Sequence, residues 1–185
     1  MPENKREYPL FALCGLNCGL CPRYQTEGAS KCPGCGGPDF PLKHPTCTVV
    51  TCNKKHDNVE FCYQCSAYPC RKYAESSPVD SFISYRNVLT DFAKAQADLK
   101  KSKADLEEKI GFLEFLLQNY NDGRRKSFYC TAVNNLDVNS LRQIREHIEQ
   151  SIKSQATDLK NKIQTIVELF EESARQAGVE LRLRK

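Results

Sequence analysis

The sequence predicts a mainly α-helical protein in which a small, irregular, Cys-rich domain precedes long antiparallel helices. Ten of the eleven cysteines lie between Cys14 and Cys70, and most of the glycines and prolines lie in the same part of the chain. After Pro78 there is no proline, and apolar residues recur at helical spacing. We therefore expect a Cys-rich domain over residues 1–78 and a helical hairpin or bundle over residues 79–185, with the boundary near Ser76 and Ser77.

The Cys-rich domain has too few large apolar side chains to be held together by hydrophobic burial alone. Crosslinks must therefore stabilise it, either as disulfides or as metal bridges. Disulfides would suit a secreted chain, but the N-terminal residues show no secretory signal and no apolar run is long enough to span a membrane. We expect a cytoplasmic protein whose thiols bind metal.

Three Cys-x-x-Cys pairs favour metal over disulfides, because two thiolates at this spacing can point at one ion about 2.3 Å from each sulfur. Glycine or proline lies in or beside two of the pairs and allows the tight turn that this geometry needs. The pairs are Cys18/Cys21, Cys32/Cys35 and Cys62/Cys65. The other candidate ligands are Cys14, Cys47, Cys52 and Cys70, together with His44 and His56.

The number of ions follows from the number of ligands. Ten thiols and two imidazoles could fill three tetrahedral sites. We expect two zinc ions, because both histidines stand beside lysines in sequences typical of solvated loops. One arrangement places Cys18, Cys21, Cys32 and Cys35 on one ion and Cys47, Cys52, Cys62 and Cys65 on the other. An interleaved arrangement stays open. Cys14 and Cys70 bracket the array and are either ligands, a free thiol pair or small buried hydrophobes.

The same residues resemble a known family. The runs that carry the resemblance are Cys14-Gly15-Leu16-Asn17-Cys18-Gly19-Leu20-Cys21-Pro22, Cys32-Pro33-Gly34-Cys35, Cys47-Thr48-Val49-Val50-Thr51-Cys52 and Cys62-Tyr63-Gln64-Cys65-Ser66-Ala67-Tyr68-Pro69-Cys70. Over residues 12 to about 73 the chain resembles domain of unknown function 3795, a bacterial and archaeal family. The resemblance implies zinc binding and implies that all ten N-terminal cysteines belong to the metal-binding pattern, but it implies no activity.

The charge of the chain argues against nucleic acid as the main partner. The formal charge of +4 counts every cysteine as neutral, whereas two zinc ions on eight thiolates would bring the total to about zero. Residues 1–78 carry nine Lys or Arg against seven Asp or Glu, and residues 79–185 carry eighteen against sixteen. Neither half is therefore strongly basic.

A seven-residue apolar repeat begins near Ser81 and predicts a long helix. Its two rows are Phe82, Leu89, Gln96, Lys103, Ile110 and Leu117, and Tyr85, Phe92, Leu99, Leu106, Leu113 and Tyr120. One helix of about 40 residues ending at Asn121-Asp122-Gly123 would carry both rows. Because Gln96 and Lys103 are polar, a break near Ser102 with a new helix cap is the alternative.

The rest of the chain predicts two further helices. A short one covers residues 127–134, and Asp137 or Asn139 then caps a long one that ends at Gly178. Its apolar stripe recurs every 3.6 residues and consists of Leu141, Ile144, Ile148, Ile152, Ala156, Leu159, Ile163, Ile166, Phe170, Ala174 and Ala177. We expect the two long helices to pack antiparallel. The alternating tail after Gly178 is either a strand or a frayed end, and we favour the frayed end.

No catalytic motif is evident, so the sequence leaves enzymatic activity open and favours its absence. Cys130 is a lone thiol without a nearby histidine, and Arg124, Arg125 and Lys126 form a short basic turn. We expect a structural zinc protein whose helices bind a protein partner or act as a scaffold. The alternatives are an iron–sulfur or thiol redox protein, and a zinc-knuckle protein that stacks nucleic-acid bases on its aromatic residues. The oligomeric state stays open.

Overall fold

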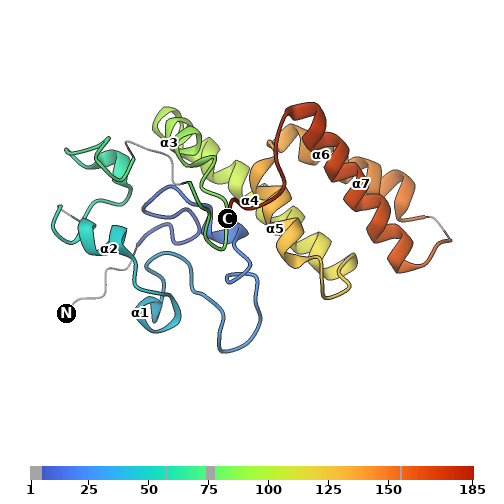
Figure 1. The fold of residues 1–185 in the computed structure, drawn as a ribbon, viewed down its shortest axis with the longest axis horizontal. Helices are drawn as coiled ribbons and strands as arrows, with labels where there is room; N and C mark the ends of the chain where they lie inside the picture. The colour runs from blue at the N-terminus through green and yellow to red at the C-terminus, as the bar shows by residue number, and fades with distance from the viewer. Residues whose placement is uncertain (1–5, 57, 74–77, 155) are drawn as a thin grey trace.

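The computed structural model describes residues 6–56, 58–73, 78–154 and 156–185, and these ranges contain helices and turns but no strand. Figure 1 shows an irregular Cys-rich half at one end and a group of helices at the other. The α-helices are α1 (Phe40–Lys43), α2 (Thr48–Asn53), α3 (Val88–Ala97), α4 (Leu99–Asn119), α5 (Lys126–Asn135), α6 (Val138–His147) and α7 (Leu159–Ala177). The predicted fold class, mainly α with an irregular Cys-rich N-terminal region, is confirmed.

The expected 40-residue helix is wrong, because the chain breaks at Asp98 into α3 and α4. Asp98 has extended backbone angles, and its carboxylate accepts a hydrogen bond of 2.9 Å from the Lys101 N–H. That bond caps α4 in place of the predicted cap at Ser102. The first two residues of one predicted apolar row also lie outside the core, since Phe82 and Leu89 are 45% and 49% exposed.

The second long helix is likewise divided. After α6 the chain makes one π-helical turn (Ile148–Ile152), and α7 then begins beyond a new cap at Asp158. A straight helix carrying the whole stripe would be about 55 Å long, whereas the 21 residues of α4 extend only about 32 Å. Folding α7 back allows both halves of the stripe to be buried on a core of that length.

Local signals placed the other helix ends correctly. The predicted short helix is α5, and the Asp137 carboxylate accepts hydrogen bonds from the backbone N–H groups of Asn139 and Ser140 at the start of α6. Gly178 ends α7 in a left-handed conformation with φ of 65°. Among the helices in the described ranges, none is both long and apolar enough to cross a membrane.

One hydrophobic core runs from the Cys-rich region into the helices. Phe92 of α3 is fully buried, and the rings of Phe11, Tyr63, Tyr68 and Tyr73 surround it with centroid distances between 5.1 and 6.0 Å. The proposed boundary at residues 76 and 77 lies outside the described residues. The division into two domains stays a prediction, but the core is shared across it.

Two glycines of the first cysteine run lie where the Cys-rich region touches the helices. A Cβ atom on Gly15 would come within 3.0 Å of Phe92 and Val88 on α3. A Cβ atom on Gly19 would come within 2.3 Å of Cδ1 of Ile110 on α4. Glycine at these positions therefore allows the 3-10 turn Cys18–Leu20 to pack closely against the helices.

We predict that Gly19→Ala destabilises the protein by about 1–3 kcal/mol, because the added methyl group overpacks this contact. Ile110→Val removes the clashing Cδ1 atom, so the double variant should recover part of the loss. Chemical denaturation of the four proteins measures this coupling. Gly111→Ala is the matched control. Gly111 lies beside Ile110 in α4 with open space around it, so this substitution should stabilise the protein by up to about 1 kcal/mol.

The C-terminal tail is fixed to the body of the protein and is neither a strand nor frayed. In Figure 1 it returns from α7 to the middle of the molecule. The Asp80 side chain is 0% exposed, and it accepts hydrogen bonds from the backbone N–H groups of Tyr85 and Arg184 and from the Arg184 guanidinium. Burial opposes ionisation of Asp80, but these bonds outweigh it and lower its pKa to about 2.

Asp80 should make stability depend on acid. Its pKa is near 4 in an unfolded chain and about 2 in the folded protein, so its contribution is complete above pH 4 and disappears as the pH falls to 2. We predict that Asp80→Asn lowers the free energy of unfolding by about 1–2 kcal/mol at pH 7 and much less at pH 2. Glu172→Gln, which removes only an exposed ion pair with Arg175, should have little effect at either pH.

Candidate metal centre

All eleven cysteines lie in the described part of the chain, and each is a free thiol. Two of the three Cys-x-x-Cys pairs have the same local structure, a 3-10 turn that begins at the first cysteine. In each turn the backbone N–H of the second cysteine, Cys21 or Cys65, donates a hydrogen bond of 3.1 Å to the carbonyl oxygen of the first. The equivalent turns place the thiols of each pair on one short loop.

Four thiols from three separate segments line one cavity of about 390 Å³. Cys52 comes from α2, Cys62 and Cys65 from the third Cys-x-x-Cys pair, and Cys70 from the loop that follows. His56 lies on the wall of the same cavity, so one of the two candidate histidines accompanies these cysteines. The four thiols are neighbours although they are separated by up to 18 positions in the sequence.

A second group of thiols lies deeper in the Cys-rich region. Burial raises the pKa of Cys14 to about 12, and the Cys35 thiolate adds to the rise, with a smaller contribution from Cys47. Burial and then the Cys35 and Cys14 thiolates raise the pKa of Cys18 well above that of a solvated thiol. The Cys21 and Cys32 thiolates also raise the pKa of Cys18, and the Cys47 thiolate raises that of Cys35. Negative charges on neighbouring sulfurs of this group disfavour one another, and a cation among them would relieve that repulsion.

Cys21 and Cys32 lie near each other. Burial raises the pKa of Cys21, hydrogen bonds from the Arg23 and Tyr24 backbone lower it, and the Cys32 thiolate raises it again. The Cys21 thiol also faces Cys130 on α5 closely enough to raise the pKa of Cys130. This pair therefore sits at the boundary between the cysteine array and the helices.

Two polar side chains support the array, and neither is marked by a local signal in the sequence. Arg6 is 7% exposed and donates hydrogen bonds to the carbonyl oxygens of Phe11 and Glu60 and to the Glu60 carboxylate. The same guanidinium lies beside the Cys35 thiol and opposes the rise in pKa that burial causes. The Tyr73 hydroxyl donates a hydrogen bond of 3.4 Å to the Cys14 carbonyl oxygen, and it also lies close enough to Cys62 to lower the pKa of that thiol.

The sulfurs are neighbours but are not in a ligating arrangement. Within the ranges that the structure describes, no group of three or more Cys, His, Asp or Glu side chains is close enough together to hold a metal ion. His44 is not near the thiols of the cavity: its ring stacks on Phe40 at a centroid distance of 4.4 Å. The predicted ligand set is therefore partly assembled, and its ligation stays a prediction.

The match to a known family covers this array. Residues 10–75 match the family model described as Protein of unknown function (DUF3795). The match includes all ten N-terminal cysteines and ends before α3, so the resemblance carried by the cysteine runs is confirmed. The description assigns no activity to residues 10–75, which are called the DUF3795 region below. A comparison with curated proteins and one with solved structures each found no match.

The lone cysteine outside the DUF3795 region has the surroundings of a core residue. Cys130 is 1% exposed on α5, and burial raises its pKa to about 12. A nucleophilic thiol instead needs a lowered pKa and access to solvent. The environment of Cys130 agrees with the interpretation that it is not a catalytic residue.

Proposed function

We propose that the DUF3795 region binds zinc through cysteine thiolates and that the metal has a structural role. The observation that supports this most directly is the cavity lined by Cys52, Cys62, Cys65 and Cys70, because four thiolates form a closed tetrahedral zinc site. The donor set also fits the ion chemically, since soft sulfur ligands suit zinc. With four protein ligands no position would remain for a water molecule, which argues for a structural rather than a catalytic ion.

Binding would require the four sulfurs to move inward to about 2.3 Å from the ion. The chain offers the freedom for this movement, because Cys62 and Cys65 stand on one short turn and Cys70 on an irregular loop. His56 is exposed at the cavity wall and would be a substitute ligand or a neighbour of the site. The Tyr73 hydroxyl would donate a hydrogen bond to one ligating sulfur, Cys62.

The second ion, in this proposal, is bound by Cys14, Cys18, Cys35 and Cys47. The Cys35 and Cys47 thiolates both raise the pKa of Cys14, and the Cys35 and Cys14 thiolates raise the pKa of Cys18 more than Cys21 and Cys32 do, which supports the grouping. It corresponds to the interleaved arrangement, in which Cys47 and Cys62 belong to different ions. Cys21 and Cys32 would then be a pair of unligated thiols, which a reducing, cytoplasmic compartment would preserve.

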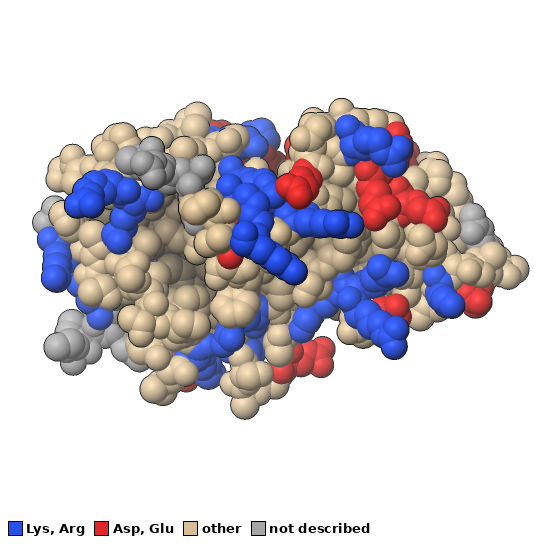
Figure 2. All heavy atoms as spheres, in the orientation of Figure 1, with Lys and Arg blue, Asp and Glu red and all other residues tan. Residues whose placement is uncertain are grey.

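The helices, in the same proposal, present a surface to a protein partner or act as a scaffold, and nucleic acid is not the favoured ligand. Several aromatic residues that could stack on bases are engaged elsewhere: Tyr63, Tyr68 and Tyr73 pack on Phe92. Figure 2 shows basic side chains on both halves of one face, with acidic side chains mainly on the helical half. On this face the basic side chains are interspersed with acidic ones, whereas a phosphate backbone requires a separate basic surface.

Metal analysis of variants tests the proposal and the pairing together. The protein purified without oxygen should be colourless and contain about two zinc ions per chain. In the interleaved arrangement Cys47→Ser with Cys62→Ser affects both ions, so the double variant should bind almost no zinc. If the two cysteines share an ion, about one zinc should remain.

A control separates ligation from general damage to the fold. Cys130→Ala removes a buried thiol outside the array and should retain both ions. A brown protein with broad absorption near 400 nm and bound iron would contradict the zinc proposal and support the iron–sulfur alternative. A protein that is folded with no bound metal at all would contradict both.

A further inference from the structure

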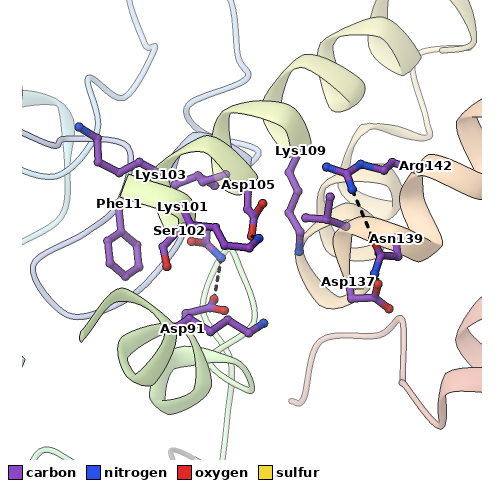
Figure 3. A pocket seen from close by; sticks show the side chains of 14 residues that line it. Phe11, Asp91, Lys101, Ser102, Lys103, Asp105, Lys109, Asp137, Asn139 and Arg142 are labelled. Carbon is purple, nitrogen blue, oxygen red and sulfur yellow. Dashed lines mark hydrogen bonds and ion pairs between the residues drawn. The ribbon is translucent and has the colours of Figure 1, made fainter. Parts of the chain in front are cut away.

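A second cavity, of about 220 Å³, lies away from the cysteine array. Figure 3 shows it between α3, α4 and the start of α6, with Phe11 from the Cys-rich region on one side. Its size falls below the roughly 300 Å³ at which pockets for drug-sized ligands begin. Any occupant is therefore small.

Lysine side chains dominate the charge of this cavity. Five cationic residues line it against three carboxylates. Several of these charges already have partners: Lys101 pairs with Asp105 at 2.7 Å, and Arg142 pairs with Glu108 at 2.6 Å. The Asp137 carboxylate caps α6.

Among the described residues, three lysines that line the cavity form no ion pair within 4.0 Å, and they are Lys94, Lys103 and Lys109. The Lys103 ammonium lies over the Tyr8 ring, 3.6 Å from its centroid, which leaves the ammonium groups of Lys94 and Lys109 for a ligand. They are close enough to each other that Lys94 lowers the pKa of Lys109. Two positive charges of this kind attract a doubly charged anion more strongly than a singly charged one.

The Lys109 ammonium is held in place by neutral groups. It donates hydrogen bonds to the carbonyl oxygens of Asn134 at 3.2 Å and Leu136 at 2.6 Å, at the end of α5. An ammonium has three N–H donors, so one remains for a ligand. Burial lowers the pKa of Lys109 to about 8, and the Asp91 carboxylate across the cavity opposes that effect. A ligand anion would oppose it in the same way.

The carboxylate opposite Lys109 is restrained by a long-range contact. Asp91 Oδ2 accepts a hydrogen bond of 2.9 Å from the Asn17 amide, and Asn17 also donates to Asn134 Oδ1 at 3.1 Å. Burial raises the pKa of Asp91, with the Asn17 bond acting against the rise. The Asn17 amide thus holds one oxygen of the Asp91 carboxylate and fixes its position on the cavity wall.

Apolar side chains complete the cavity wall. Phe11, Leu106 and Val138 lie beside the charged residues. Phe11 and Leu106 are largely buried, and Phe11 reaches the cavity from the Cys-rich region. A bare inorganic ion would leave this apolar surface uncovered. An organic group attached to the anion would cover it and add hydrophobic stabilisation.

We propose that this cavity binds a small phosphate monoester, with its phosphoryl oxygens on the ammonium groups of Lys94 and Lys109 and its carbon part against Phe11, Leu106 and Val138. The dianionic head matches the combined charge of these two ammonium groups, and lysine ammonium groups bind phosphate as point charges. The proposal concerns binding alone and does not depend on the metal ions of the DUF3795 region.

Titration of the full-length, metal-loaded protein with phenyl phosphate, inorganic phosphate and benzoate tests the proposal. Amide chemical shifts in nuclear magnetic resonance spectra report where each probe binds. Phenyl phosphate should saturate one site per chain with shifts around Asn17, Asp91 and Val138. Inorganic phosphate and benzoate should each bind about tenfold more weakly, because one lacks the apolar part and the other lacks the second charge.

Lys94→Gln is the decisive variant, because Lys94 is exposed on α3 and its replacement should leave the fold intact. It should weaken phenyl phosphate binding about tenfold, which corresponds to the loss of one charged contact. Lys100→Gln removes an exposed lysine of α4 outside the cavity and should leave the affinity unchanged. Equal weakening by both variants would show nonspecific attraction and overturn the proposal. The absence of saturable binding by phenyl phosphate, or stronger binding of benzoate, would also overturn it.

Discussion

The packing of aromatic rings around Phe92 connects the two halves of the chain. The Phe92 side chain is 0% exposed, and three of the four rings around it meet it edge-on, the arrangement that aromatic pairs favour. All four rings belong to the Cys-rich region, whereas Phe92 belongs to α3. The DUF3795 region therefore completes its hydrophobic core with a residue from outside its own boundaries, which explains how a segment so poor in large apolar side chains can have a defined structure.

This shared core also positions the cysteines. The ring of Tyr73 packs on Phe92, and the hydroxyl of the same residue reaches Cys62. Cys62 in turn borders Phe61, which is 1% exposed in the core.

Burial by the core raises the pKa of the nearest thiols, so they need a cation or a donor such as Arg6 if they are to be ionised. Core packing and the proposed metal binding would thus be coupled, because the shared core positions the loops that carry the thiols and the proposed ions would fix those loops. Structural zinc in small domains contributes on the order of 10 kcal/mol to folding.

The features predicted correctly from the sequence depend on neighbouring residues. The cap at Asp137, the stop at Gly178 and the short helix α5 are each set within a few positions of the chain. The apolar periodicity predicted helices that are too long, because a repeating pattern carries no information about the size of the core that the helices must cover. The break at Asp98 and the return of α7 both limit helix length to what the neighbouring elements can cover.

The unpredicted features depend on contacts between distant residues. The cysteine spacing identified the candidate ligands but not which of them are neighbours. The cavity combines Cys52 of α2 with a loop that begins ten positions later, at Cys62. The cavity proposed to bind a phosphate monoester depends on Asn17 and Asp91, which are 74 positions apart, and on lysines that look like ordinary surface residues in the sequence. A tail that alternates apolar and charged residues gave no sign of the Asp80 contact 104 positions away.

We propose that the Cys-rich region is held by both Phe92 and bound ions, so that neither is sufficient alone. Hydrogen exchange of backbone amides, measured before and after complete chelation of the metal-loaded protein, tests this most directly. The amides of Cys35 and Cys62, which donate hydrogen bonds to Pro9 and Leu13 in the loops, should lose protection after chelation. Those in the buried parts of α4 and α7 should retain most of theirs. Unchanged protection at Cys35 and Cys62 in the metal-free protein would contradict the account.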